Sequence, residues 1–158
     1  MNNSRRAFLI LRVVVGLQFV AAGAFSLRGW EATVLFNALL VGPDLAGLAT
    51  GLAVALNLVG GLSLVAAIQP RLGALLLLAF LLPATIRHGV AAQHADALLS
   101  GLGSEPDATA LELAGLARRG QLAAVAKNVA LMAVVGFIAA TSRAVSPPPP
   151  RDSEAERR

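Results

Sequence analysis

Four long apolar segments constrain this chain more than any other feature of its sequence. They cover about residues 8–27, 45–68, 72–91 and 122–141, and each supplies the roughly 20 mainly apolar residues that a helix needs to cross a bilayer. Because the bilayer core offers no water to backbone N–H and C=O groups, a spanning segment has to satisfy them internally as a helix. The sequence therefore predicts an all-α fold, a transmembrane antiparallel four-helix bundle.

The composition supports a membrane protein and excludes several other classes. Hydrophobic residues make up 56% of the chain and charged residues 14%, with a mean hydropathy of +0.71, whereas ordinary globular chains have roughly 25% charged residues. No cysteine is present, which excludes disulfides, thiolate metal sites and cysteine nucleophiles. The net charge of +4 does not indicate nucleic-acid binding, because the basic residues lie at helix ends and in the tail.

The segments between the apolar runs predict how the helices are joined. The Gln-Pro-Arg sequence at residues 69–71 separates the second and third runs, so we expect a tight helical hairpin with the proline as the stop signal. The Gly-Pro-Asp sequence at residues 42–44 is typical of a helix start. The long polar connection at residues 92–120 allows a short helix at about residues 108–119. The proline-rich, charged residues 142–158 predict a disordered tail after a single transmembrane domain at residues 1–141.

The basic residues predict the orientation. The side that holds both termini has Arg5, Arg6, Arg71 and the arginines of the tail. The opposite side has the loop acids together with Arg28, Arg118 and Arg119. Because basic residues are enriched in cytoplasmic loops, we expect a multi-pass protein of the bacterial inner membrane with both termini in the cytoplasm. A second interpretation stays open, since SRRAFL at residues 4–9 resembles a twin-arginine export signal. Arg12 within the apolar run and the three further runs disfavour it.

Arg12 and His88 lie near the ends of spanning runs. Arg12 is about one turn inside the first run, so we expect its guanidinium to extend to the headgroups, with an inward-facing charge as the alternative. His88 follows Arg87 just over one turn after Pro83, a residue type that bends helices. We expect Arg87 and His88 to reach the headgroups as well, although the bend also allows both side chains to point inward.

Asn57, Lys127 and Asn128 are the other polar groups within the runs. Asn57 shares one helical stripe with Thr50, seven residues earlier, so both are expected to face the bundle interior. The default role of Asn57 is an interhelical hydrogen bond, and a ligand contact is the alternative. Lys127 can extend to the headgroups, whereas Asn128 lies about 100° further round the helix. The pair therefore predicts a helix edge that faces other helices.

The histidines and acids do not have the spacing of a metal or catalytic site. His88 and His94 are six residues apart and so lie on different helical faces, and no acidic residue lies within a spanning run. Nucleophile and nucleotide-binding motifs are also absent from the sequence. We therefore expect no metal site and no catalytic residue. The candidate interior polar or ligand-binding residues are Arg12, Asn57, His88, Lys127 and Asn128.

Small residues predict where helices approach one another closely. Gly47, Gly51 and Ala55 recur at four-residue spacing in the second run, and Gly16 and Gly23 form a looser face in the first run. Because small side chains let helix backbones approach in lipid, we expect both faces to be helix contacts.

Three short patterns resemble the DoxX-like family of membrane proteins. The first run, LRVVVGLQFVAAGAFSL, resembles the first helix of the family, and the second run has paired glycines before a short basic turn. KNVAL, at residues 127–131, is similar to the motif that opens the family's last helix. The matching residues are Arg12, Gly16, Phe19, Gly23, Gly60, Gly61, Arg71 and Lys127. The resemblance covers about residues 8–141 and implies a four-helix integral membrane protein.

Two positions depart from the family pattern. Asn57 stands where family members commonly have a glutamate, and Ser26 stands where many have a lysine. If those groups form a charged interior site in relatives, this chain lacks part of that site.

The resemblance also implies a class of function. Some DoxX-like relatives are membrane subunits of redox complexes, including thiosulfate:quinone oxidoreductase. We therefore predict a non-catalytic membrane subunit or scaffold of a redox complex that has no cofactor of its own and docks a redox partner or a quinone. The expected partners are the lipid bilayer, a redox protein and further copies of the chain, without nucleic acid. The alternative is a small carrier or a protein that binds lipids or small molecules, and a stand-alone enzyme is the least favoured reading.

Overall fold

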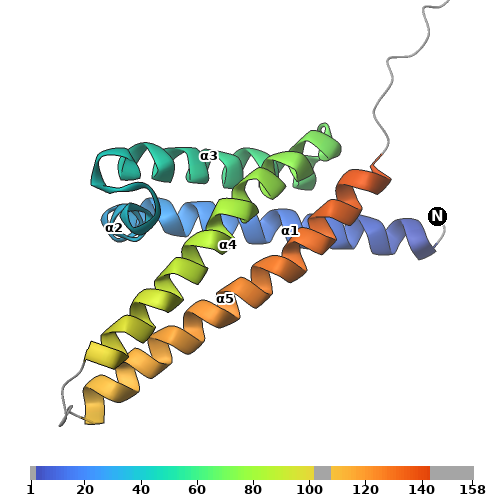
Figure 1. The fold of residues 1–158 in the computed structure, drawn as a ribbon. Helices are drawn as coiled ribbons and strands as arrows, with labels where there is room; N and C mark the ends of the chain where they lie inside the picture. Colours follow the sequence, from blue (N-terminus) through green and yellow to red (C-terminus); the bar gives the residue numbers. More distant parts are fainter. Residues whose placement is uncertain (1–2, 102–107, 143–158) are drawn as a thin grey trace, which may run out of the picture.

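The computed structural model describes residues 3–101 and 108–142, which form five α-helices (Figure 1). The helices are α1 (Asn3–Arg28), α2 (Trp30–Val41), α3 (Pro43–Ala66), α4 (Pro70–Gly101) and α5 (Ala108–Thr141). Four stretches are long and apolar enough to cross a membrane, namely Asn3–Arg28, Pro43–Ala66, Pro70–Ala97 and Thr109–Thr141. The all-α class and the four predicted spans are therefore confirmed. The predicted tail lies outside the described residues, apart from Ser142.

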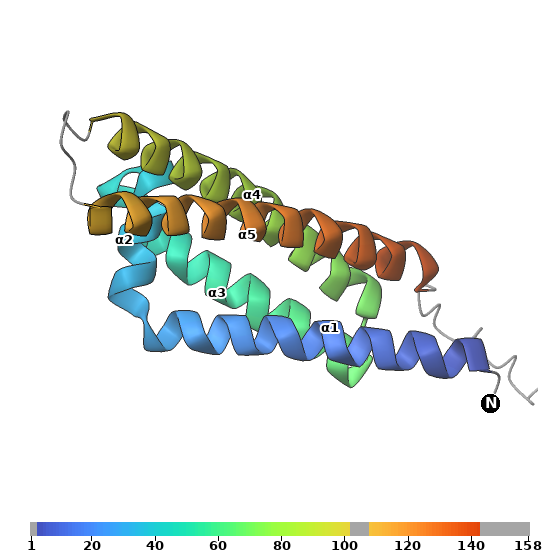
Figure 2. The ribbon, with the colours of Figure 1, turned by 90° about the horizontal axis from the view of Figure 1, so that it is seen from below.

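The four long helices pack side by side in the order α1, α3, α4 and α5 (Figures 1 and 2). They run in alternating directions, so the start of α1 and the end of α5 lie together, and we call this the terminal end. The short helix α2 packs on α3 towards the opposite end, which we call the far end. Each long helix contributes to one apolar core, whose buried residues are Val15, Phe19, Leu64, Ala74, Leu77, Leu81, Val135 and Ile138.

A pair of adjacent glycines sets the distance from α3 to both of its long neighbours. A Cβ atom added to Gly61 would lie 2.7 Å from the carbonyl oxygen of Gly16 on α1. A Cβ atom added to Gly60 would lie 2.8 Å from the side chain of Leu77 and 3.0 Å from the carbonyl oxygen of Gly73, both on α4. Gly60 and Gly61 therefore allow two helices to approach α3 from different sides.

The close-contact face predicted at Gly47, Gly51 and Ala55 is not where the long helices meet α3. A Cβ atom added to Gly47 would have no neighbour within 4 Å, and one added to Gly51 would lie 3.8 Å from Trp30 of α2. Ala55 is exposed on the isolated chain. Four-residue spacing shows that a close approach is sterically allowed, but other contacts decide which small residues a partner covers. The face predicted on α1 is buried, since Gly16 and Gly23 both lie against α3.

The two prolines predicted to mark helix boundaries both begin helices. Pro43 is the first residue of α3, after Gly42 with a φ of 80°, and Asp44 lies in the first turn. This arrangement confirms the predicted helix start. Pro70 is the first residue of α4, so it is a start and not the expected stop signal. The first turn of a helix tolerates proline because its missing N–H has no partner there anyway.

The end of α3 is closed by the turn that precedes α4. Ala67 takes the left-handed conformation with a φ of 61°, and Gln69 has a φ of 47°. The Ser63 hydroxyl donates hydrogen bonds to the carbonyl oxygens of Ile68 and Gln69, the latter at 3.2 Å. These bonds fasten the last turn of α3 to the residues that follow it, where the Gln69 carbonyl also accepts the N–H of Gly73 at 3.1 Å. The tight hairpin predicted at residues 69–71 is therefore present.

The helix α2 is not among the predicted elements. Its 12 residues extend about 18 Å, which is too short to cross a bilayer core of about 30 Å. It follows α1 almost directly, because Gly29 donates its N–H to the carbonyl oxygen of Phe25 and accepts the N–H of Thr33. The sequence signal for α2 was apolar but shorter than a span, so a search for spans passes over it.

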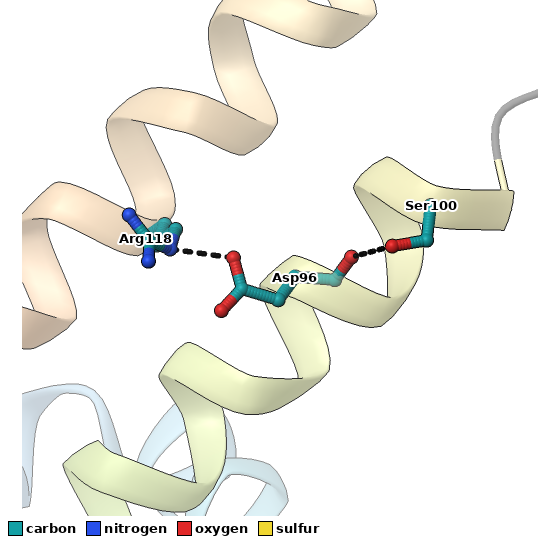
Figure 3. Close-up of polar contacts among 3 residues, drawn as sticks. All are labelled: Asp96, Ser100 and Arg118. Carbon is teal, nitrogen blue, oxygen red and sulfur yellow. Dashed lines mark hydrogen bonds and ion pairs between the residues drawn. The ribbon is translucent and has the colours of Figure 1, made fainter.

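The polar connection predicted at residues 92–120 is largely helical instead. The helix α4 continues to Gly101, and the short helix expected at residues 108–119 is the first part of α5. An ion pair of 2.5 Å between Arg118 and Asp96 joins the two helices, and the Ser100 hydroxyl donates to the backbone carbonyl of Asp96 at 2.9 Å (Figure 3). Polarity alone did not indicate a loop, because this segment has the alanines and leucines of a good helix former and no proline within the described part.

Candidate functional site

A chain of polar side chains connects α2, α3 and α4 near the far end. The side-chain amide of Asn37 donates to the Thr50 hydroxyl at 2.7 Å, and that hydroxyl donates to the carbonyl oxygen of Ala46 at 2.8 Å. Arg87 on α4 donates through Nη1 to the side-chain oxygen of Asn37. Thr50 is completely buried and Asn37 is 7% exposed. Both ends of the Asn37 amide are therefore occupied by bonds to other helices.

Phe36 of α2 holds the neighbouring part of α4. The guanidinium carbon of Arg87 lies 4.4 Å from the centre of the Phe36 ring, and the His88 ring centre lies 5.4 Å from it. A guanidinium over an aromatic face is attracted by the electron density of the ring. Consecutive residues of α2 thus fix Arg87 in two ways, through a ring and through an amide.

The polar chain borders a cavity of about 170 Å³ between α2, α3 and α4. The cavity is open on one side, and several of the apolar residues around it are exposed on the isolated chain. The Nε atom of Arg87 is buried and has no hydrogen-bond partner among the described residues. The lining residues are Asn37, Leu40, Val41, Ala49, Leu52, Ala53, Leu56, Ala79, Phe80, Pro83, Ala84 and Arg87. They include hydrogen-bond donors but no acid, thiol or hydroxyl, so the cavity is suited to holding an oxygen-bearing group and not to attacking one.

Arg87 and His88, for which a headgroup position is the preferred prediction, both contact other helices in the structure. Arg87 turns towards α2, and the Nδ1 atom of His88 lies 2.6 Å from the side-chain oxygen of Gln121 on α5. The inward alternative, with Pro83 inside α4 one turn earlier, describes both side chains better. The physical reason is that α2 and α5 supply polar partners at this level, which spares the side chains the longer reach to water.

Asn57, another candidate residue, lies buried at the contact of α3 with α1. Asn57 is 2% exposed; its amide donates to the carbonyl oxygen of Ala53 on its own helix at 2.8 Å, and its side-chain oxygen is buried without a partner. It packs against Gly23 of α1, as the predicted inward stripe with Thr50 requires. An interhelical hydrogen bond for Asn57 is absent among the described residues.

Lys127 and Asn128 differ in exposure, as expected for neighbouring residues that point in different directions from one helix. Lys127 is exposed on the isolated chain, whereas Asn128 is 6% exposed. Lys127 is close enough to His88 to act on it electrostatically. Arg12 is half-buried, and its Nε atom is buried without a partner, so the inward alternative holds for at least that part of the side chain.

The five candidates therefore do not form one site. His88 and Lys127 lie near the far end, Asn57 lies at the contact of α3 with α1, and Arg12 lies towards the terminal end on α1. The polar residues of the cavity are Asn37 and Arg87, and Asn37 was missed because it belongs to the unpredicted helix α2. The available signal was an asparagine within an otherwise apolar stretch of 12 residues.

Comparison with known proteins identifies the family. No curated protein matches the chain, and no solved structure matches it either. The model of the DoxX family matches residues 7–90, which is more than half of the chain. The match contains the motifs of the first two runs as well as Asn37 and Arg87, whereas Lys127 lies beyond it. This four-span membrane protein therefore belongs to the DoxX family.

Proposed function

We propose that the protein is a non-catalytic membrane subunit that holds the head of a membrane amphiphile between α2, α3 and α4 and presents it to a redox partner. The observation that carries this proposal is the position of Arg87, which lines a largely apolar cavity and is held there by Phe36 and Asn37. A mainly apolar pocket with a few well-placed polar groups is the usual form of a small-molecule site.

The size of the cavity limits what it can take up. Its volume of about 170 Å³ is similar to that of an engineered protein cavity of roughly 150 Å³ that binds benzene. One ring, or a head group with a few methylenes, fills this space. The remainder of a longer ligand would leave through the open side, where Leu52 is 59% exposed and would face lipid chains.

Two kinds of head group suit this arrangement. A quinone ring, which a redox complex would supply, can accept a hydrogen bond from Arg87 at a carbonyl oxygen and pack on the apolar walls. An anionic head can accept the same hydrogen bond and would make the protein a carrier or a lipid-binding protein. This second candidate function is favoured by the positive charge at the cavity and the absence of an acid from its lining.

The test compares two alanine-to-leucine variants of α3. Ala53 lines the cavity, whereas Ala55 is exposed, so Ala53→Leu fills the site and Ala55→Leu is the matched control. The full chain and both variants are purified in a mild detergent, followed by native mass spectrometry, an absorbance spectrum and identification of co-purified proteins. We expect a bound small molecule in the wild type and in Ala55→Leu that is lost in Ala53→Leu. A quinone spectrum with a co-purified oxidoreductase supports the redox subunit, and equal occupancy in all three proteins contradicts the cavity as a ligand site.

A further inference from the structure

Among the residues that the structure describes, no carboxylate lies within 4 Å of the Arg87 guanidinium. Arg87 stays protonated at any ordinary pH, and its partners are an amide oxygen and an aromatic ring, both of them neutral. Within the described part of the chain, an ion pair with its nitrogen and oxygen atoms less than 4 Å apart is formed by Arg118 and Asp96. The Nε atom of Arg87 is buried and lacks a hydrogen-bond partner among the described residues, so the protein leaves one donor of this guanidinium unpaired.

The surroundings of Arg87 hold a second cation and few acids. Lys127 of α5 acts electrostatically on His88, the residue that follows Arg87. The nearest acids along α2 and α3 are Glu31 and Asp44, both exposed and both in the first turns of their helices. Glu31 lies six residues before Asn37 on α2, and Asp44 lies six residues before Thr50 on α3. Six residues correspond to about 9 Å along a helix axis.

The guanidinium of Arg87 is half-buried and lacks an acidic partner among the described residues. Ionised groups inside membrane proteins almost always pair with an opposite charge or face water. Here the unpaired donor is on a residue that lines a cavity whose other walls are mainly apolar and whose open side is bordered by exposed leucine. The missing partner is therefore expected to be an anion, and the walls are expected to hold the apolar part attached to it.

We infer that the cavity takes a single-chain amphiphile with an oxyanion head, of which a carboxylate is the simplest case. This inference rests on the proposed function, because it names the ligand class of the same cavity. The head accepts hydrogen bonds from Arg87, and the chain leaves between α2 and α3 into the lipid. An oxyanion is preferred to a neutral carbonyl because it adds the attraction between opposite charges to the hydrogen bond from the guanidinium.

Trp30 provides a reporter for the test. It is the single tryptophan of a chain without tyrosine, and it lies 3.8 Å from a Cβ atom placed on Gly51, next to the cavity residue Leu52. The full chain in phosphatidylcholine nanodiscs is titrated with dibromostearate, whose bromine atoms quench tryptophan, and with its methyl ester, which has the same chain and no charge. The titration is run at about pH 9, well above the usual range of a carboxyl group.

Three variants separate the effect of the Arg87 charge from the effect of the cavity volume. Arg87→Gln removes the charge and keeps donor atoms, Arg71→Gln removes an exposed arginine at the terminal end, and Ala53→Leu fills the cavity. Far-UV circular dichroism shows whether each variant folds. If Arg87→Gln does not fold, Arg87→Lys, which keeps the charge but loses the forked donors, takes its place and is expected to keep a weakened preference for the anion.

The expected result is quenching by dibromostearate at about tenfold lower concentration than by the ester, as the loss of one charged hydrogen bond would give. Arg87→Gln abolishes the preference, Arg71→Gln keeps it, and Ala53→Leu removes the saturable quenching by both compounds. Equal quenching by both compounds that Ala53→Leu still removes overturns the anionic head but leaves the proposed function intact, and a neutral quinone then becomes the favoured occupant. Quenching that Ala53→Leu does not change overturns both. Displacement of dibromostearate by equally low concentrations of inorganic sulfate shows a site for a free oxyanion and overturns the amphiphile.

Discussion

Asn37 joins three helices through one side chain. Its amide nitrogen donates a hydrogen bond to Thr50 of α3, and its amide oxygen accepts one from Arg87 of α4. Asn57, the asparagine at the centre of α3, bonds only to a carbonyl of its own helix among the described residues. Two buried asparagines of the same chain therefore contribute differently to the contacts between helices.

We expect Asn37→Leu to destabilise the protein more than Asn57→Leu. The first change leaves Arg87 and Thr50 without their partner, which costs about 1–3 kcal/mol for buried polar groups. The second removes a bond within one helix and an unpaired oxygen, so its cost is expected to be at most about 0.6 kcal/mol. The free energy of unfolding is measured by titrating the protein in mixed micelles with sodium dodecyl sulfate. Equal losses for the two variants would show that the Asn37 bonds do not stabilise the bundle.

Gly61 is a residue at which one added methyl group is expected to destabilise the bundle. In Gly61→Ala the new methyl group would meet the carbonyl oxygen of Gly16 at 2.7 Å and Val20 at 2.9 Å, so α1 has to move away from α3. We expect a loss of about 1–3 kcal/mol, as is typical of overpacking. Gly47→Ala is the control, because nothing lies within 4 Å of its new methyl group and alanine favours the helix. A Gly61→Ala protein as stable as Gly47→Ala would contradict the close approach of α1 and α3.

At the scale of elements, α2 has more influence on the cavity than its length suggests. It is too short to span the membrane, yet it contributes the ring and the amide that hold Arg87 and part of the cavity wall. Its position follows from its short connections to α1 and α3, through Gly29 and Gly42. The far end of the bundle is therefore closed around the cavity by a helix that lies outside the set of four spans.

The turn between α3 and α4 allows a prediction with a matched control. Ala67 has a φ of 61°, a conformation that disfavours residues with a Cβ atom, so Ala67→Gly is expected to stabilise the protein by up to about 1 kcal/mol. Ala66 is the last residue of α3, where glycine is expected to cost up to about 1 kcal/mol. Unfolding in mixed micelles measures both variants. The same sign for both changes would argue against the left-handed conformation at Ala67.

For the whole molecule, charge is distributed unevenly along the bundle. The four acids of the described residues are Glu31, Asp44, Asp96 and Glu112, and each belongs to a helix end away from the terminal end. Among the described arginines near helix ends, positions 5, 6 and 71 lie at the terminal end, and positions 28, 118 and 119 lie at the far end with the acids. The sequence adds four more arginines after α5, and because positively charged residues are retained on the cytoplasmic side, we predict cytoplasmic termini.

The orientation can be tested by labelling single cysteines, because the chain has no cysteine of its own. Asn3→Cys marks the terminal end and Ala117→Cys marks the far end, and both residues are exposed. We expect a membrane-impermeant maleimide to label Ala117→Cys on intact cells from which any outer membrane has been removed, and to label Asn3→Cys only after the membrane is opened. Ala21→Cys, in the apolar part of α1, is the control that should stay unlabelled in both conditions. The reverse pattern would place the termini outside.

The sequence by itself determined the features of this protein that depend on short stretches of chain. The four spans, the helix start at Pro43 and the inward stripe of Thr50 and Asn57 follow from hydropathy, from local backbone chemistry and from the period of the helix. The family resemblance of the first two runs also depends on short sequence patterns, and the family match at residues 7–90 confirms it.

Only the tertiary structure decided which polar groups meet. The contact of Asn37 with Arg87 joins residues 50 positions apart, and that of His88 with Gln121 joins residues 33 positions apart. In a membrane protein, the surfaces that face lipid and those that face other helices are both apolar, so the sequence pattern does not show which face of a helix is covered. The cavity exists because a helix too short to span the bilayer packs against two that do, and that placement depends on the packing of the assembled bundle.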